Sequence, residues 1–365
     1  MSEPTISPQP TLDMDKVQNF AFKMIADITA CQMGTLTTIG DRLGLFACLA
    51  SSKPLTLAEF ASLAEIQERY AREWLSAMAC HGYIAYDDTQ KRFSMTPEQA
   101  FCLANPDSPF FLTPMIVMAP SYWNNLDLLT DAFQNGGGVP QDRFGTEWRC
   151  GFERFSRTAF RNNLAQDWIP AMPHVDAALR AGGSVADVGC GNGQALIFLA
   201  QAYPDATLVG YDIFAPSVEA ANANAAAAGL ANRLHYEVYD ASEGIPGSYD
   251  LITTFDVVHD MPRPRLALKQ IRNALKSEGT YFVLEFKFWS DLQKNIEHPL
   301  GIGAFGYSVS TNYCMTQALA VGGEGTGTCM GEDIMRELAA EAGFTRFQSL
   351  DFPNNPFNLF YEIRA

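Results

Sequence analysis

From Gly182 onward, the chain alternates short apolar segments with stretches of helical character, and this alternation limits the folds open to it. Apolar segments that alternate with helices predict a parallel β-sheet with helices packed against it. The last two segments, 344–352 and 358–365, are joined by Pro-Asn-Asn-Pro, so we expect them to pair antiparallel at one sheet edge. The preceding apolar segments lie at 184–189, 206–212, 233–240, 249–258 and 280–286. The predicted fold class is therefore α/β.

The first of these strands runs into a loop with glycine at every second position, Gly189, Gly191 and Gly193, shortly after Asp187. Glycine lets the backbone approach a ligand closely and aim amide groups at it. Asp212 ends the next strand, at the distance where a carboxylate reaches the hydroxyl pair of a ribose. Nicotinamide-dependent dehydrogenases use a similar loop. Asp187 before the first glycine favours instead a ligand with ammonium and carboxylate groups in place of a pyrophosphate.

Residues 17–107 predict a separate, mainly helical domain. Helical periodicity covers 33–50 and 68–79, and Thr56 with Glu59 has the spacing of a capping box. The alternating segments 83–88 and 91–96, joined by a polar turn, predict a hairpin. Three helices and a hairpin form a winged-helix outline. Residues 1–16 are polar, lack the apolar core of a signal sequence and are expected to be a disordered lead-in.

A winged helix can bind DNA, and the charge of the chain bears on that possibility. The chain has 25 basic and 41 acidic residues, for a formal net charge of −16. A duplex-binding surface needs clustered Lys and Arg, so we expect no nucleic acid partner and no anionic membrane surface. No apolar run in the sequence is long enough to cross a bilayer. Eight dispersed cysteines without a Cys-x-x-Cys pair predict reduced thiols in a cytoplasmic protein.

Residues 108–180 are rich in aromatic side chains and connect the two predicted domains. Core packing is the ordinary role of each aromatic residue, but a connector of this kind is also a favourable place for a substrate pocket. The candidates for that pocket are Phe155, Phe160 and Trp168, with Tyr313 from a later insertion.

With these motifs, residues 181–365 resemble the class I S-adenosylmethionine-dependent methyltransferases. The resemblance implies a Rossmann-like seven-stranded sheet, with the methionine end of the cofactor S-adenosylmethionine at the glycine loop and its ribose at Asp212. It also implies adenine contacts at Asp240 and Ala241, and further cofactor contacts at Phe255 and Asp256 on the fourth strand. Together with the winged helix, the whole chain resembles small-molecule O- and C-methyltransferases. Similar enzymes have intertwined N-terminal helices, which implies a homodimer.

His259 and Asp260 follow the fourth strand, whose end borders the ligand crevice in an open α/β sheet. An imidazole there can take a proton from an acceptor near neutral pH, whereas the structural alternative is a histidine that caps the next helix. In similar plant-type O-methyltransferases, the histidine of a His-Asp pair is the general base and a glutamate orients it. Glu285 matches that glutamate. A second glutamate of the pattern falls near Cys329 here, so the orienting pair is incomplete.

Similar bacterial C-methyltransferases of 2-oxo acids bind a metal through a matching His-Asp pair and a later histidine. Here the later position falls near Tyr313, and His298 is only a distant candidate, so no metal is expected. The leading hypothesis is therefore methyl transfer to a small organic acceptor, namely a phenol, a hydroxyl or an activated carbon. Its predicted catalytic residues are His259, Asp260 and Glu285. Metal-assisted C-methylation of a 2-oxo acid and a ligand-sensing winged-helix regulator remain as alternatives.

Overall fold

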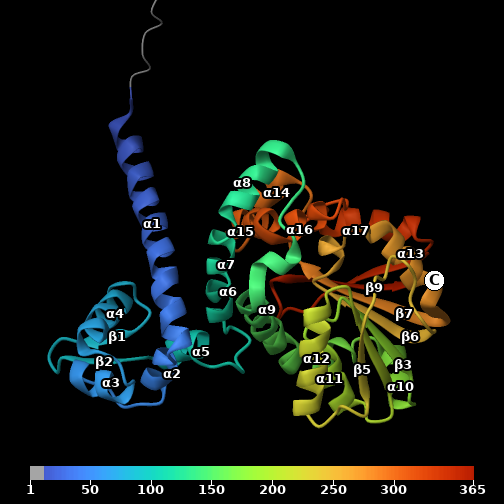
Figure 1. The fold of residues 1–365 in the computed structure, drawn as a ribbon, viewed down its shortest axis with the longest axis horizontal. Helices are drawn as coiled ribbons and strands as arrows, with labels where there is room; N and C mark the ends of the chain where they lie inside the picture. The colour runs from blue at the N-terminus through green and yellow to red at the C-terminus, as the bar shows by residue number, and fades with distance from the viewer. Residues whose placement is uncertain (1–11) are drawn as a thin grey trace, which may run out of the picture. The chain divides into compact units, whose positions relative to one another are not determined.

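The computed structural model describes residues 12–365, so most of the predicted disordered segment 1–16 lies outside the described residues. The chain divides after Asn105 into two compact units, whose course along the chain is coloured in Figure 1. The connector 108–180, predicted as a segment of its own, belongs to the second unit. Within residues 12–365, no helix combines the length and the apolar character needed to span a bilayer.

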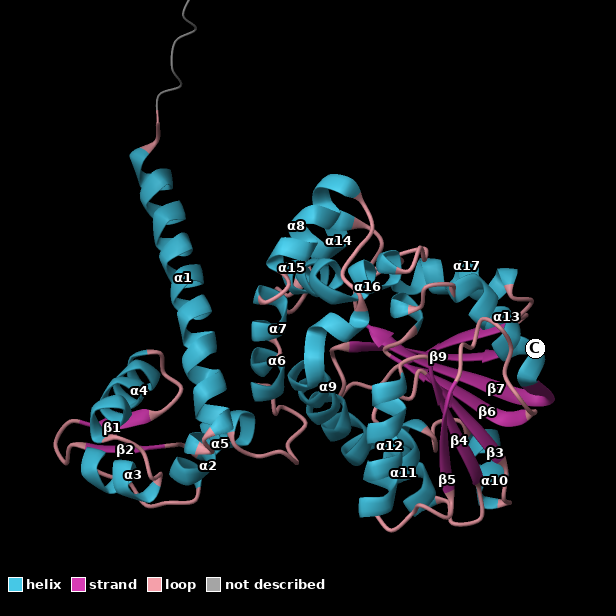
Figure 2. Ribbon diagram, viewed as in Figure 1, coloured by secondary structure: helices cyan, strands magenta, loops and turns pink. Residues whose placement is uncertain are grey.

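The N-terminal unit is helical with one small hairpin (Figure 2). Its first helix begins at Met14 after the N-cap Asp13, so residues 14–16 are helical and do not belong to a disordered lead-in. The predicted capping box of Thr56 and Glu59 is present, and the predicted hairpin forms between β1 and β2. The elements are α1 (Met14–Arg42), α2 (Leu45–Ala50), α3 (Leu57–Leu63), α4 (Glu68–Cys80), β1 (Ala85–Asp87), β2 (Arg92–Ser94) and α5 (Pro97–Leu103).

The core of the N-terminal unit forms around Trp74 of α4. Its ring stacks on Phe60 at a centroid distance of 5.8 Å, and its indole N–H donates to the Leu36 carbonyl at 2.9 Å. The first half of α1 is different, because its apolar side chains face away from this core. Phe20 and Phe22 are 64% and 67% exposed in this unit. An apolar helix face of this kind is a contact surface for another chain in many soluble proteins.

The C-terminal unit contains a seven-stranded sheet in the order β5-β4-β3-β6-β7-β9-β8. The strands from β5 to β7 run parallel, and β9 lies antiparallel between β7 and β8, which confirms the predicted antiparallel edge. The strand order reverses between β3 and β6, and ligands bind at such a switch point in open α/β sheets. The strands are β3 (Ser184–Val188), β4 (Thr207–Asp212), β5 (Leu234–Val238), β6 (Tyr249–Phe255), β7 (Leu275–Phe286), β8 (Arg346–Leu350) and β9 (Asn358–Arg364).

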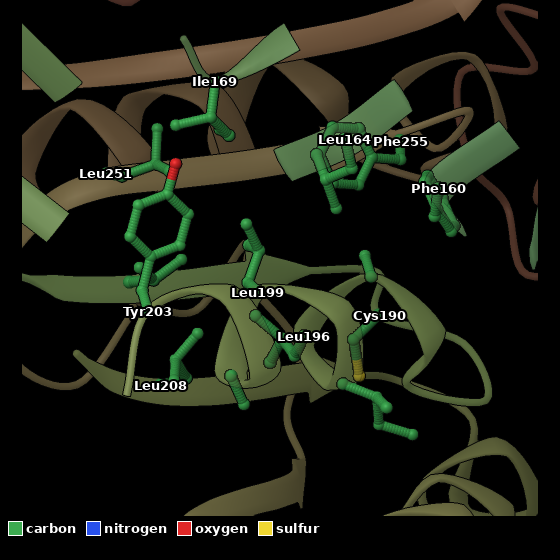
Figure 3. Close-up of a cluster of buried hydrophobic side chains, with 14 of the residues drawn as sticks. Phe160, Leu164, Ile169, Cys190, Leu196, Leu199, Tyr203, Leu208, Leu251 and Phe255 are labelled. Carbon is green, nitrogen blue, oxygen red and sulfur yellow. The ribbon is translucent and has the colours of Figure 1, made fainter. Parts of the chain in front are cut away.

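Helices cover both faces of this sheet. Successive strand residues point to opposite faces, so neighbouring residues of one strand pack against different helices. Leu251 of β6 packs in the cluster that includes Leu196 and Leu199 of α11, as Figure 3 shows. Its neighbour Ile252 packs in the opposite cluster, with Leu268 of α13. The helices on the two faces are α10 (Pro173–Arg180), α11 (Gln194–Ala202), α12 (Ala215–Ala227), α13 (Pro264–Ala274) and α17 (Gly331–Glu341).

The connector and the insertion after β7 complete the unit, and each contains a π-helix. The π-helix η2 (Phe160–Trp168) continues α9, and η4 (Ser310–Cys314) lies between α15 and α16. A π-turn changes which side chains a helix directs to one side, and such turns are frequent at functional sites. The other helices of these segments are α6 (Thr113–Val117), α7 (Ala119–Trp123), α8 (Leu126–Asn135), η1 (Gln141–Phe144), α9 (Gly145–Ala159), α14 (Leu292–Ile296), α15 (Gly303–Val309) and α16 (Met315–Ala320).

Candidate active site

A cavity opens at the carboxyl ends of β3, β4 and β6, on the side where the connector and the insertion meet the sheet. Its walls come from the loop after β3, the ends of β4 and β6, helix α9, and the η4–α16 segment. The lining residues include Gln141, Trp148, Arg149, Phe152, Glu153, Phe160, Asp187, Gly189, Gly191, Asp212, Asp240, Ala241, Phe255, Asp256, Asp260, Tyr313 and Gln317.

The glycine loop needs glycine for reasons that the structure makes specific. Gly189 has a φ of +72°, and a Cβ there would lie 2.3 Å from the Val257 side chain. Gly193 has a φ of +80°, and a Cβ there would lie 2.7 Å from the Tyr236 ring. Gly193, unlike Gly189 and Gly191, does not line the cavity. Gly193 instead fixes the loop to β5, because its carbonyl accepts a hydrogen bond from the Tyr236 hydroxyl at 2.8 Å.

Two acidic residues predicted from the sequence lie at the ends of adjacent strands. Asp212 accepts the Gly191 amide at 2.8 Å and the Phe214 amide at 2.9 Å, so it ties the loop to β4. Asp187 is 2% exposed and accepts the Thr253 hydroxyl at 2.7 Å. Burial raises the pKa of Asp187 to about 7 and also raises the pKa of Asp212. Both carboxyls line the cavity, where a cation would stabilise their charged forms.

The predicted adenine-side residues also line the cavity. Asp240 accepts the Ser242 hydroxyl at 2.6 Å and pairs with Arg263 at 2.5 Å, and Ala241 follows it. Burial tends to raise the pKa of Asp240, but the hydrogen bonds from Ser242 and the Arg263 charge lower it overall. Phe255 and Asp256 lie at the end of β6, and the buried Asp256 has a φ of +55°, a conformation that non-glycine residues rarely adopt.

His259, Asp260 and Glu285 come together, as the sequence predicted, but only Asp260 lines the cavity. The His259 ring is 1% exposed, its Nδ1 pairs with Glu285, and its Nε2 lies 3.3 Å from Asp260 Oδ1. Glu285 also accepts the Val258 amide at 2.8 Å. The insertion covers this turn, since the Gly327 amide donates to the His259 carbonyl at 3.0 Å. Of the three predicted catalytic residues, Asp260 is therefore the one that lines the cavity, and His259 lies behind it.

The charges of this buried group affect one another. Burial lowers the pKa of His259, but the carboxylates of Glu285 and Asp260 raise it further, so it lies well above its usual value. Burial raises the pKa of Asp260. An imidazolium held between two carboxylates stabilises both of them.

Cys314, which no sequence motif indicated, lies with its thiol beside His259 and Asp260. One ligand atom from each of these three side chains lies within 4.8 Å of the other two. Position 313, where an imidazole was expected in similar C-methyltransferases, is Tyr313, and the next residue of η4, Cys314, lies at the histidine instead. Imidazole, carboxylate and thiol are ligand types of transition metals, so the residues fit an ion in which Nε2 is the histidine donor. The Nδ1 bond to Glu285 matches the carboxylate that commonly supports a metal-bound histidine.

Two of the four aromatic residues predicted for the substrate pocket line the cavity. Phe160 and Tyr313 line the cavity, and Tyr313 stacks on Trp148 at a centroid distance of 3.6 Å. Trp168 is 1% exposed and packs in the core 4.9 Å from Phe360, and Phe155 does not line the cavity either. Their prediction as pocket residues is wrong, because composition alone cannot show the direction of an aromatic side chain within α9 and η2.

Sheet order, antiparallel closing strand, glycine loop and cavity position together define the fold class of the S-adenosylmethionine-dependent methyltransferases. Residues 179–343 match a family model described as a methyltransferase domain, and residues 31–105 match an Rv2258c-like winged HTH domain. The chain therefore combines a methyltransferase domain with an N-terminal winged helix-turn-helix domain. This result confirms the predicted family and fold class, and it supports the predicted class of enzyme.

The chain is also similar to individual proteins. It is 28% identical over 182 residues to methyltransferase ungE' of Aspergillus campestris, which covers 44% of this chain and 52% of that protein. The chain spans about half the length, or less, of the curated relatives it matches.

Solved structures share the fold over nearly the whole chain. The mitomycin 7-O-methyltransferase is 21% identical with a TM-score of 0.66, and the alignment covers 96% of this chain and 100% of that one. Human N-acetylserotonin methyltransferase, solved in complex with S-adenosylmethionine, is 17% identical with a TM-score of 0.67, and the alignment covers 99% of each chain. At these identities, the likeness concerns the fold.

Proposed function

We propose that the chain transfers the methyl group of S-adenosylmethionine to a small organic acceptor. One observation carries the proposal: a single cavity joins the loop Gly189–Gly191 and the Asp212 carboxylate on one wall to the stacked rings of Trp148 and Tyr313 on another. The loop and Asp187 would hold the methionine end, Asp212 the ribose, and Asp240 with Ala241 the adenine. Bound S-adenosylmethionine supplies an already activated methyl group, so the protein mainly has to position the acceptor.

The acceptor side of the cavity favours a planar molecule. Trp148 stacks on Phe152 at 5.5 Å and on Tyr313 at 3.6 Å, and Phe160 lies on the same cavity wall as Phe255, 5.2 Å from it. Flat aromatic walls recognise flat ligands through offset stacking and exclude water from the reacting groups. A phenol or an acidic carbon of an aromatic oxo acid fits this description.

For proton removal, we assign the contact with the acceptor to Asp260 and a supporting role to His259. Asp260 faces the cavity with a raised pKa, which brings the carboxylate closer to the basicity that abstraction near neutral pH requires. His259 lies behind it, held by Glu285, and balances the charge of the carboxylate. The predicted catalytic group is thus retained with the roles of its members changed.

Calorimetric titration with S-adenosylmethionine and with NAD tests the cofactor. We expect binding of the first and no binding of the second, since the loop has carboxylates where a pyrophosphate would lie. A screen of phenols and 2-oxo acids with radiolabelled cofactor then tests the acceptor, followed by location of the transferred carbon. Binding of NAD alone would contradict the proposal. A winged helix that retards duplex DNA at moderate salt would favour the regulator instead.

The cluster of His259, Asp260 and Cys314 favours metal-assisted C-methylation as a second candidate function. An ion held by these residues would act as a Lewis acid that polarises the oxo group of an oxo-acid acceptor. Titration with Co²⁺ tests this candidate, because thiolate coordination produces a charge-transfer absorption band that Cys314→Ser removes. Cys80→Ser, an exposed thiol elsewhere in the chain, is the matched control. Absence of the band in the wild type would eliminate this candidate and leave the first intact.

We further propose a cytoplasmic homodimer that acts on small molecules and binds neither nucleic acid nor membranes. The exposed apolar residues of α1, among them Phe20, Phe22 and Ile28, support the dimer. The eight free cysteines support a reducing compartment. Light scattering of the wild type and of a Phe20→Glu, Ile28→Glu variant tests the dimer, and a monomeric wild type would contradict it.

A further inference from the structure

Glu153 of α9 lines the cavity next to the glycine loop, and its carboxylate accepts hydrogen bonds from three side-chain amides. Asn192 donates to one oxygen at 2.7 Å, and Gln194 and Asn224 donate to the other at 2.6 and 2.8 Å. These amides come from the loop after β3, the first turn of α11 and α12, so three separate elements fix one carboxylate. A carboxylate held in this way keeps its orientation when a ligand enters.

The neighbouring arginines on the same helix do not neutralise this carboxylate. Arg149 and Arg157 lie one turn on either side of Glu153, at the spacing where ion pairs ordinarily form on a helix. Arg149 instead lies over the Phe214 ring at 5.3 Å, and Arg157 lies over the Phe198 ring at 5.9 Å. Within residues 12–365, no Lys, Arg or His side chain forms an ion pair with Glu153. Its carboxylate therefore faces the cavity held by amides and by no ion-pair partner, although Arg149 also lines the cavity.

We propose that Glu153 binds the α-ammonium group of the cofactor. The inference rests on the proposed function, which brings the methionine end of the cofactor to the loop that contains Asn192. An ammonium group has only donors, and Glu153 presents acceptor oxygens whose positions the three amides already fix. Glu153 thereby distinguishes ligands that carry the amino-acid end from nucleosides that lack it. Through α9 it also connects the aromatic acceptor wall to cofactor binding, since Trp148 and Phe152 belong to the same helix.

Two ligands separate this role from a merely structural one. S-adenosylhomocysteine carries the ammonium group, whereas 5′-methylthioadenosine retains the adenine, the ribose and the thioether but lacks the amino-acid end. We expect Glu153→Gln to weaken calorimetric binding of S-adenosylhomocysteine by roughly ten- to a hundredfold, the loss of one charge-assisted hydrogen bond. Binding of 5′-methylthioadenosine should change by less than about twofold, because that ligand has no ammonium group to interact with Glu153.

Glu219→Gln is the matched control, because it makes the same charge change at an exposed position of α12 outside the cavity. It should alter neither affinity. Asn224→Ala provides a second route if the glutamine variant does not fold. Asn224 does not itself line the cavity, and its amide also donates to the Asn192 carbonyl at 3.0 Å. The substitution removes one of the amides that hold Glu153, and it should weaken S-adenosylhomocysteine alone.

Equal weakening of both ligands by Glu153→Gln would show that Glu153 only ties α9 to the loop, and the inference would fail. Unchanged binding of S-adenosylhomocysteine would overturn it as well. In both cases the wild type still binds the nucleoside, so the proposed function stands. A wild-type chain that binds neither ligand would overturn the proposed function together with this inference.

Discussion

Replacing His259 with alanine tests the buried charge group beside the cavity. His259 and Glu285 are 1% and 3% exposed, and each supplies the main charged partner of the other. Without the imidazole, Glu285 keeps the Val258 amide as a donor but loses its cation. Removing one partner of a buried ion pair costs about 3–5 kcal/mol, which is a large part of the roughly 5–15 kcal/mol that stabilises a typical domain.

A second substitution shows whether the cost arises from the stranded charge. In the His259→Ala background, Glu285→Gln removes the unpaired carboxylate while preserving an acceptor for the Val258 amide. We expect it to restore about 1–3 kcal/mol of the lost unfolding free energy, the penalty of an unsatisfied buried group. Alone, Glu285→Gln should destabilise the protein, so the double-mutant cycle should give a large coupling energy.

Urea denaturation of the two single variants, the double variant and the wild type measures these energies. His235→Ala is the control, because that histidine is exposed on β5, and its effect should stay within about 0.5 kcal/mol. Turnover should fall in His259→Ala while S-adenosylhomocysteine affinity is maintained, since the ring does not line the cavity. A loss below about 1 kcal/mol with additive energies would refute the stranded-charge reasoning. Unchanged turnover would reduce His259 to a structural role.

Three further predictions concern the cofactor loop. Gly193→Ala should lower the free energy of unfolding in urea by about 1–3 kcal/mol, because the added Cβ would lie 2.7 Å from Tyr236. Gly229→Ala is the control, because Gly229 has a similar φ but open space around it, and its loss of unfolding free energy should be smaller. The raised pKa of Asp187 means that its contribution to stability is full below the ordinary value of 3.8 and is lost as the pH rises through about 7. Asp187→Asn should therefore gain stability relative to the wild type as the pH rises from about 4 to about 7, and a constant difference over that range would contradict this linkage. Asp212→Asn should weaken S-adenosylhomocysteine binding by roughly tenfold or more in calorimetry, and unchanged affinity would remove Asp212 from the ribose site.

The residues that sequence reasoning located correctly owe their positions to chain order. Asp187, Gly189 and Asp212 follow directly from strands whose parallel pairing brings their carboxyl ends to one edge of the sheet. The closing antiparallel pair was predictable for a similar reason, because a short connection leaves few alternatives. The positions of these residues and of the closing strand pair can therefore be predicted from the local sequence, without knowledge of how distant segments pack.

The rest of the site depends on packing between distant segments. Glu153 reaches the loop across 39 residues of sequence from Asn192, and Cys314 reaches the histidine across the whole insertion. Neither residue belongs to a recognisable motif. Helical periodicity also fails to predict the side-chain directions in η2, because a π-helix has more residues per turn than an α-helix. Phe160 lines the cavity, whereas Trp168 of the same π-helix packs in the core.

The two π-helices make the acceptor wall sensitive to chain length. A π-turn closes its hydrogen bonds between residues five apart where an α-turn uses four, so deleting one residue can convert the former to the latter. Such a deletion within 310–314 would rotate every side chain that follows it in the helix, Gln317 among them, while leaving each amino acid identity unchanged. Single-codon deletions and insertions, and not only point substitutions, are therefore a direct means by which evolution or an engineer could reshape which acceptors this scaffold admits.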